Sequence, residues 1–194
     1  VIVDDRLYVA HGEFCTAFDA QTGQQVFQTS TGQANTEWGY LAHVNGLLLG
    51  SSGKMGSVDR PLLRLSGITR EHAGLSCSDE LFACDPKTGK RLWTYSPPHG
   101  AIINPAIACS GKRVCFLESL DPGTRQTKFG RAKLRPLLEK GARLIALDIM
   151  TGKQIWETKP DLQDVQFIVY LSATQDTVIV TGSCHKEINS VVKN

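Results

Sequence analysis

The 194-residue sequence has no long apolar run and no strong excess of charge of either sign. Its longest apolar runs have the length of a strand, whereas a helix that spans a bilayer needs about 20 apolar residues. We therefore expect no transmembrane segment. The net charge is only +2, from 21 basic and 19 acidic side chains. This balance gives no large field of one sign, so the composition does not predict a nucleic-acid-binding protein.

Paired cysteines are also missing, because none of the six cysteines belongs to a Cys-x-x-Cys pair. This excludes the usual zinc-ribbon, thioredoxin-like and c-type haem patterns. The even number permits a disulfide framework, but a chain of this length and apolar content does not depend on one. We favour reduced thiols buried in strands. The cysteines are Cys15, Cys77, Cys84, Cys109, Cys115 and Cys184.

Common catalytic signatures are absent as well. The sequence contains no G-x-S-x-G, no G-x-x-x-x-G-K-[ST] and no H-E-x-x-H, which are the motifs of serine hydrolases, phosphate-binding loops and zinc proteases. Its histidines share no spacing typical of metal ligands. The sequence therefore assigns no catalytic residue and no metal site.

One motif, however, occurs three times. The segments "LFACDPKTGKRLW" (81–93) and "LIALDIMTGKQIW" (144–156) share Ala-x-Asp-x-x-Thr-Gly-Lys-x-x-Trp, and "CTAFDAQTGQQVF" (15–27) matches in part. Each copy predicts a strand, a turn in which Asp accepts backbone hydrogen bonds and Gly takes a positive φ, and a returning strand. We expect its aromatic residue to pack on a neighbouring unit. The predicted docking residues are Asp19, Gly23, Phe27, Asp85, Gly89, Trp93, Asp148, Gly152 and Trp156.

A second series of turns alternates with the first. Asn45-Gly46 is a strong hairpin signal, and Asp4-Asp5, Ser110-Gly111 and Gln175-Asp176 stand at corresponding places. Each unit then has four antiparallel strands, and without two insertions the units repeat about every 40 residues, as propeller blades do. The prediction is an all-β propeller with about three blades and the first hairpin of a fourth. The blades span approximately 1–33, 34–98, 99–160 and 161–194, with insertions at 51–77 and 119–141.

The repeated motif resembles the tryptophan-docking motif of quinoprotein-like β-propellers, also called the pyrroloquinoline quinone (PQQ) repeat. Two copies match fully and one partly, and the resemblance extends from near Val1 to the hairpin between Val165 and Ser183. Members of the family usually have seven or eight blades, so we expect the sequence to be a fragment of a longer ring. The resemblance also implies a periplasmic or otherwise extracytoplasmic location.

The same repeat occurs in proteins of different function. Resemblance to the outer-membrane assembly lipoprotein implies a non-catalytic scaffold, without a cofactor, that binds a protein, a ligand or the rest of the propeller. The alternative is part of a PQQ-dependent alcohol dehydrogenase, in which carboxylate and amide ligands hold calcium beside the quinone. No adjacent Cys-Cys pair and no matching acidic motif occur here, so we favour the scaffold. A propeller fused to another functional domain is a third alternative.

Both insertions join the second and third strands of a blade, so they project from one face of the disc, where functional residues are commonly displayed. The first contains a Thr-Arg-Glu-His cluster, and the second is the most basic segment of the chain. Arginine and histidine suit an anionic ligand or an acidic surface, although a solvated loop explains the same residues. The candidate ligand-face residues are Arg70, His72, Arg131 and Arg135.

Overall fold

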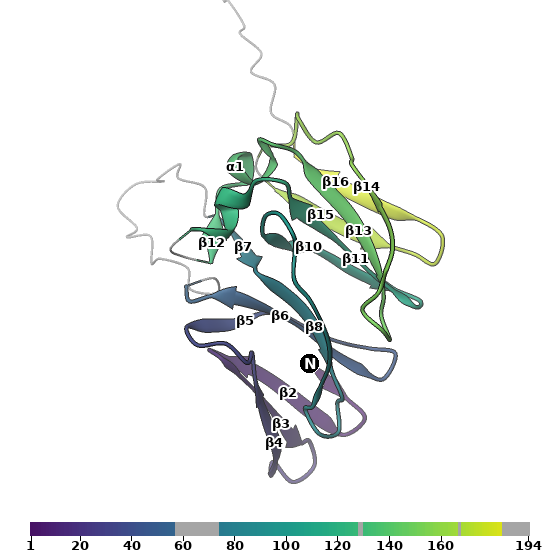
Figure 1. Ribbon diagram of the computed structural model, residues 1–194. Coiled ribbons are helices and arrows are strands. Elements are labelled where there is room, and N and C mark those ends of the chain that lie inside the picture. Colours follow the sequence, from purple (N-terminus) through teal and green to yellow (C-terminus); the bar gives the residue numbers. More distant parts are fainter. Residues whose placement is uncertain (57–73, 128–129, 167, 184–194) are drawn as a thin grey trace, which may run out of the picture.

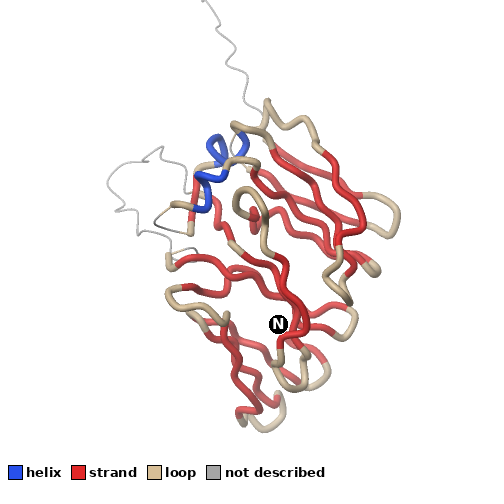
Figure 2. The backbone as a smooth tube through the Cα atoms, in the orientation of Figure 1, coloured by secondary structure: helices blue, strands red, loops and turns tan. Residues whose placement is uncertain are grey.

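The computed structural model describes residues 1–56, 74–127, 130–166 and 168–183. Strands account for nearly all the regular structure of these residues, and the two short helices lie close together at one end of the molecule (Figures 1 and 2). The sheets follow one another along the chain. The prediction of an all-β propeller with four-stranded antiparallel units is confirmed.

The first two sheets have four strands each, in antiparallel order. The first contains β1 (Ile2–Val3), β2 (Arg6–His11), β3 (Phe14–Asp19) and β4 (Gln25–Ser30). The second contains β5 (Thr36–Val44), β6 (Leu47–Lys54), β8 (Glu80–Cys84) and β9 (Arg91–Tyr95). Strand β6 extends into the range 51–77, so less of that range lies outside the sheet than the sequence suggested.

The third sheet has two strands more than a four-stranded blade. Its regular part is β10 (Ile102–Ser110), β11 (Arg113–Ser119), β13 (Ala142–Asp148) and β14 (Gln154–Thr158). Beyond β10, the sheet continues into β7 (Leu75–Ser78) and then β12 (Arg131–Ala132), which come from the two insertions. The last sheet described is the hairpin β15 (Val169–Ala173) and β16 (Val178–Gly182).

Local sequence explains the hairpins between the first and second strands. Asp4 and Asp5 have φ values of 47° and 58°, and Asn45 and Gly46 have 50° and 72°. Two successive positive φ values define the type I′ turn, whose twist matches that of the flanking strands. Aspartate, asparagine and glycine tolerate this left-handed backbone best. These dipeptides therefore fix the register between the first and second strands of the first two sheets.

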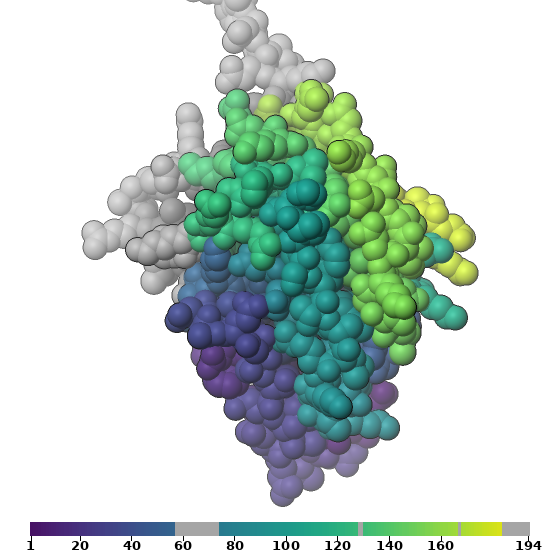
Figure 3. Space-filling model, in the orientation of Figure 1, coloured from purple at the N-terminus to yellow at the C-terminus, as the bar shows by residue number. Residues whose placement is uncertain are grey.

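The core consists of three clusters, each between two successive sheets. Tyr8 and Trp38 belong to the cluster between the first and second sheets, and Leu49 and Phe116 to that between the second and third. The third cluster packs the hairpin β15–β16 on the third sheet. In Figure 3 the sequence colours follow one another across the molecule, from the purple N-terminal end to the yellow residues near the C-terminus. Five cysteines of the described residues are free and lie in strands, as expected: Cys15, Cys77, Cys84, Cys109 and Cys115.

Aromatic side chains of two sheets lie on the Thr-Gly turn of the following sheet. A Cβ placed on Gly89 would be 2.7 Å from the Phe27 ring, and one placed on Gly152 would be 2.6 Å from the Trp93 ring. The Nε1 of Trp93 also donates a hydrogen bond of 3.0 Å to the carbonyl of Ile149. Glycine is needed at both turns, because the ring occupies the space of a side chain.

Candidate binding face

Four short elements at one end of the sheets form a surface that we call the insertion platform. They are β7 (Leu75–Ser78), the 3-10 helix η1 (Pro122–Arg125), β12 (Arg131–Ala132) and the helix α1 (Leu134–Leu138). All four derive from the two predicted insertions, and Figure 1 shows them grouped at the same end. The described parts of the two insertions therefore lie on one face of the sheets.

Backbone hydrogen bonds join the two insertions to each other. Strand β12 pairs antiparallel with β7, so that Arg131 lies opposite Ser76. The N–H of Cys77 donates to the carbonyl of Gly130 at 2.8 Å, and the N–H of Gly130 to that of Met55 at 3.4 Å. Residues that are far apart in sequence thus form one continuous surface.

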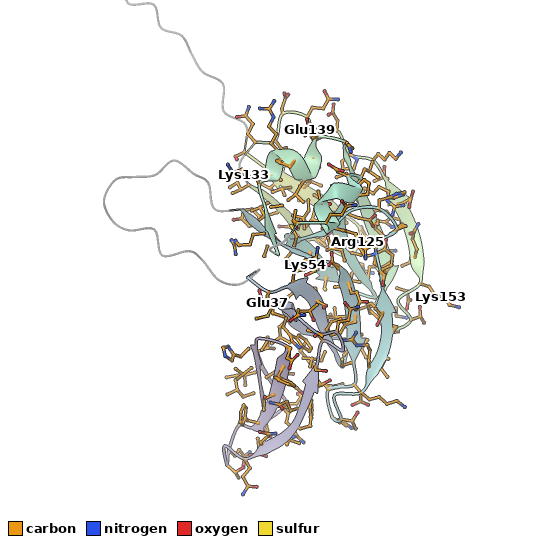
Figure 4. The ribbon with its side chains drawn as sticks, turned by 60° about the vertical axis from the view of Figure 1, so that its left-hand side comes forward. Glu37, Lys54, Arg125, Lys133, Glu139 and Lys153 are labelled. Atoms are coloured by element: carbon orange, nitrogen blue, oxygen red, sulfur yellow. The ribbon has the colours of Figure 1, made fainter. Side chains whose placement is uncertain are left out.

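Lys54, the last residue of β6, anchors the second insertion. Its Nζ donates hydrogen bonds to the carbonyl of Arg125 and, at 2.9 Å, to that of Thr127. The guanidinium of Arg125 in turn donates to the carbonyl of Pro97 at 2.7 Å. Figure 4 shows Lys54 and Arg125 next to each other. Because a lysine stem is long and its ammonium has three donors, one side chain can hold both ends of this turn.

Asp79 completes this polar cluster between β7 and β8. Its Oδ1 lies 3.7 Å from the Nε of Arg125, in a partly buried ion pair. Burial raises the pKa of the Asp79 carboxyl above its ordinary value, and the nearby charges of Lys54 and Arg125 oppose this rise. Both cations also donate to backbone carbonyls, and this local cluster shows no nucleophile paired with a base. The cluster therefore holds residues 125–127, and with them the charge of Arg125, in place.

The outer surface of the platform is charged. Helix α1 buries Leu134 and Leu137 and leaves Lys133 and Arg135 exposed. Beside the helix is an open depression of about 390 Å³, which we call the α1 pocket. Its lining combines apolar and charged side chains and comes from two segments, residues 138–141 and 159–163. A surface of this kind can contact a partner with both apolar and polar groups.

The structure brings two of the four ligand-face candidates together on the platform. Arg131 is half-buried in β12, and Arg135 is exposed on α1. Arg70 and His72 lie outside the described residues. The sequence did not single out Lys54 or Asp79, because their roles depend on contacts with an insertion more than 40 residues away. The docking residues stand elsewhere, at the turns between the third and fourth strands of each sheet.

Calcium in a PQQ site would need several oxygen ligands, carboxylates among them. No group of three or more histidine, cysteine, aspartate or glutamate residues in the described part of the chain is arranged to hold a metal ion. The buried carboxylate of Glu118 already accepts hydrogen bonds from Arg143 and from the Tyr95 hydroxyl. The described residues therefore do not fit a calcium–quinone centre by themselves. Within the same residues, no helix is long and apolar enough to cross a membrane.

Antiparallel four-stranded sheets that succeed one another and pack face to face define a β-propeller, here represented by part of the ring. A family model described as "Outer membrane protein assembly factor BamB" (PQQ_2) matches residues 15–186. The chain therefore belongs to this family of PQQ-like repeat propellers. No curated protein matches the chain at a significant level.

Solved structures of the same architecture are similar to this chain at low sequence identity. The crystal structure of BamB from Moraxella catarrhalis has 13% identity and a TM-score of 0.50, over 92% of this chain and 40% of that one. Quinohemoprotein alcohol dehydrogenase from Comamonas testosteroni has 17% identity and a TM-score of 0.50, over 82% of this chain and 20% of that one. The enzyme ADHIIG from Pseudomonas putida HK5 has 14% identity and a TM-score of 0.50, over 91% and 29%. These similarities show the fold, and the chain spans less than half of each structure.

Proposed function

We propose that the chain is a non-catalytic binding module and that the insertion platform is its binding surface. The observation that carries the proposal is the construction of this platform. Two insertions from different sheets pair through β7 and β12 and are held by Lys54. Ordering such segments costs conformational entropy, and a joined surface at the loop-bearing face is a suitable place for recognition.

The partner proposed for this surface is a protein with an acidic contact region. Lys133 and Arg135 are exposed on α1, and Arg131 lies on the adjoining strand. Arginine binds carboxylates through two parallel hydrogen bonds, and exposed charges of one sign speed the encounter with a partner of the other sign. The family description supports a role in the assembly of outer membrane proteins and hence an extracytoplasmic location.

Site-specific photo-cross-linking tests this proposal in the full-length polypeptide, in its native cell envelope. A photoreactive residue at position 135 should give a protein adduct. The same residue at position 153 should give none, because Lys153 is exposed on the turn at the other end of the sheet (Figure 4). Lys133→Glu should weaken the adduct at 135 about tenfold by reversing a charge beside it. Lys153→Glu is the matched control and should leave the adduct unchanged.

Equal adducts at positions 135 and 153, or no adduct at 135, would contradict the binding role of the platform. The dehydrogenase alternative has a separate test. PQQ and Ca²⁺ added to the full-length polypeptide should produce neither quinone absorbance in the purified protein nor dye-linked oxidation of alcohols. Either signal would show that the complete ring contains an enzyme site.

A further inference from the structure

A second charged surface lies at the end of the second and third sheets that is opposite the insertion platform. We call it the turn face, and it consists of the Thr-Gly turns 85–90 and 148–153 and the hairpin tip 110–113. Strand β13 separates the two surfaces, since it begins shortly after α1 and ends at the second of these turns. Figure 4 accordingly shows Lys153 far from Lys133.

Hydrogen bonds between neighbouring turns make the turn face one continuous surface. The Nε1 of Trp93, just after the first turn, donates to the carbonyl of Ile149 in the second turn at 3.0 Å. The N–H of Ile149 donates to the carbonyl of Lys112 in the hairpin tip at 2.9 Å. The side-chain amide of Asn45, at the tip of the neighbouring hairpin, donates to the carbonyl of Gly111. The three segments therefore keep fixed positions relative to one another.

The turn face is basic. Its exposed cations are Lys87, Lys90, Lys112, Arg113 and Lys153. None of them forms an ion pair with a residue of the described part of the chain. The two carboxylates of the turns, Asp85 and Asp148, are half-buried and accept backbone N–H groups of their own turns. Two carboxylates offset five cations only in part, so a net positive charge faces the solvent.

Exposed apolar side chains accompany these cations. Met150 lies at the tip of the second turn, and the adjoining outer strands β9 and β14 expose Leu92 and Ile155. The turn holds Met150 in place, because its N–H donates to the Oδ1 of Asp148 at 3.0 Å. Apolar side chains beside lysines are the combination with which peripheral proteins enter the headgroup region of a bilayer.

The residue types favour a lipid surface over an acidic protein as the partner of the turn face. Protein interfaces are enriched in arginine and aromatic residues and depleted in lysine. Four of the five exposed cations on the turn face are lysines, whose ammonium group is a compact, strongly hydrated point charge. Such charges bind the mobile phosphates of anionic lipids through the surface potential and need no fixed partner geometry.

We propose that the turn face docks on the surface of a bilayer that contains anionic lipids. The lysines of both sheets attract the lipid phosphates, and Met150 enters the headgroup region. The first sheet takes no part, because Asp4 and Asp5 are exposed at the corresponding hairpin tip. The insertion platform, at the opposite end, then faces away from the lipid. This inference goes beyond the proposed function and does not depend on it, since a lipid contact gives no protein adduct at position 153.

Co-sedimentation of the purified protein with vesicles tests the proposal. At low salt the protein should sediment with phosphatidylcholine vesicles that contain about 30% phosphatidylglycerol and not with pure phosphatidylcholine. Salt of about 0.5 M should abolish the binding by screening. Lys87→Gln/Lys153→Gln should weaken it at least about tenfold, since each lysine near an anionic surface contributes about fivefold. Gln25→Glu/Gln28→Glu, on the exposed outer strand of the first sheet, lowers the net charge equally and should change the binding by less than about twofold.

The two methionines of the chain provide a second matched pair. Met150 is 51% exposed on the turn face, and Met55 is 52% exposed at the end of β6 beside the insertion platform. Met150→Gln should weaken vesicle binding about threefold, because a polar side chain enters the headgroup region less readily. Met55→Gln should leave the binding unchanged. Circular dichroism confirms that each variant is folded.

Several results would overturn the proposal. Equal losses in the two double variants would show a response to net charge alone. Equal binding to neutral and anionic vesicles, or no binding to either at low salt, would exclude docking through lipid phosphates. If polyglutamate binds with the same dependence on Lys87 and Lys153 and the vesicles do not bind, the turn face is a site for an acidic protein instead.

Discussion

The indole ring of Trp93 lies directly on Gly152, across the boundary between the second and third sheets. A Cβ at Gly152 would be only 2.6 Å from the Cδ2 of Trp93, and the Nε1 of the indole donates to the carbonyl of Ile149 in the same turn. The φ of Gly152 is +69°. Glycine is thus required at this position for two reasons: the conformation of the backbone and the room for the ring.

Replacement of Trp93 should destabilise the protein, because its ring packs on the following turn. We expect Trp93→Ala to lower the free energy of unfolding by about 3 kcal/mol, because it removes a large packed ring and leaves a cavity. Trp93→Phe should lower it by about 1 kcal/mol through loss of the Nε1 hydrogen bond and some contact. Urea denaturation measures both values. A loss below about 1 kcal/mol for Trp93→Ala would show that the ring contributes little to the packing between the second and third sheets.

A buried ion pair in the third sheet should be sensitive to removal of its cation. Arg143 binds Glu118 at 3.0 Å and Glu157 at 2.6 Å, and the Glu118 side chain is fully buried. Arg143→Met leaves Glu118 buried without this partner and should cost about 3 to 5 kcal/mol. Glu157→Gln alters the exposed end of the network and should cost about 1 kcal/mol or less. Chemical denaturation should show this order, and equal losses for the two variants would contradict it.

The turn aspartates should make stability depend on acid pH. Hydrogen bonds from the side chain and backbone of Thr151 lower the pKa of Asp148 below its ordinary value of 3.8. A carboxyl whose pKa is lower in the folded state stabilises the protein above its unfolded pKa. This contribution is lost as the pH falls through the folded pKa. The difference in melting temperature between the protein and Asp148→Asn should therefore shrink below about pH 4. A difference that is constant from neutral to acid pH would refute this account.

The strand-buried thiols should react slowly in the native protein. Burial raises the pKa of the Cys77 thiol to about 12 and that of the Cys15 thiol to about 11. At pH 8 these thiols are therefore almost entirely protonated, and the thiolate is the reactive form. Alkylation by iodoacetamide, followed by mass spectrometry, should label these residues only after unfolding. Rapid labelling of Cys77 in the folded protein would show that this strand opens readily.

The repeated turns could be predicted from sequence because their chemistry is local. Asn45-Gly46 requires positive φ values that few other residues tolerate, and the structure has them at both positions. The motif around Asp148 and Gly152 likewise combines its turn donors and acceptor within five residues. Their regular spacing was then sufficient to predict the propeller architecture.

The insertion platform could not be predicted in the same way. Strands β7 and β12 are four and two residues long, and neither has a marked alternation of apolar and polar residues. Strand β7 pairs with the edge of β10, and β12 pairs in turn with β7. In the sequence, Lys54 looks like an ordinary exposed lysine. Its structural role is to donate hydrogen bonds to the carbonyls of residues more than 70 positions later in the chain. Trp93 and Trp156 have the same local motif, but Trp93 lies on Gly152, whereas Trp156 lines an open depression beside the hairpin β15–β16. Sequence alone could not show this difference.

A double-mutant cycle between Trp93 and Gly152 tests most directly the claim that the repeated motif joins one sheet to the next. Gly152→Ala should cost about 1 to 2 kcal/mol for the positive φ and more for the collision with the ring. In a Trp93→Ala background only the first cost remains. The loss in the double variant should therefore be smaller than the sum of the single losses by at least about 1 kcal/mol. Gly23→Ala is the control, because a Cβ placed on Gly23 would have no other described residue than its chain neighbours within 4 Å. It should be additive with Trp93→Ala. Additivity of Gly152→Ala and Trp93→Ala within about 0.5 kcal/mol would contradict the claim.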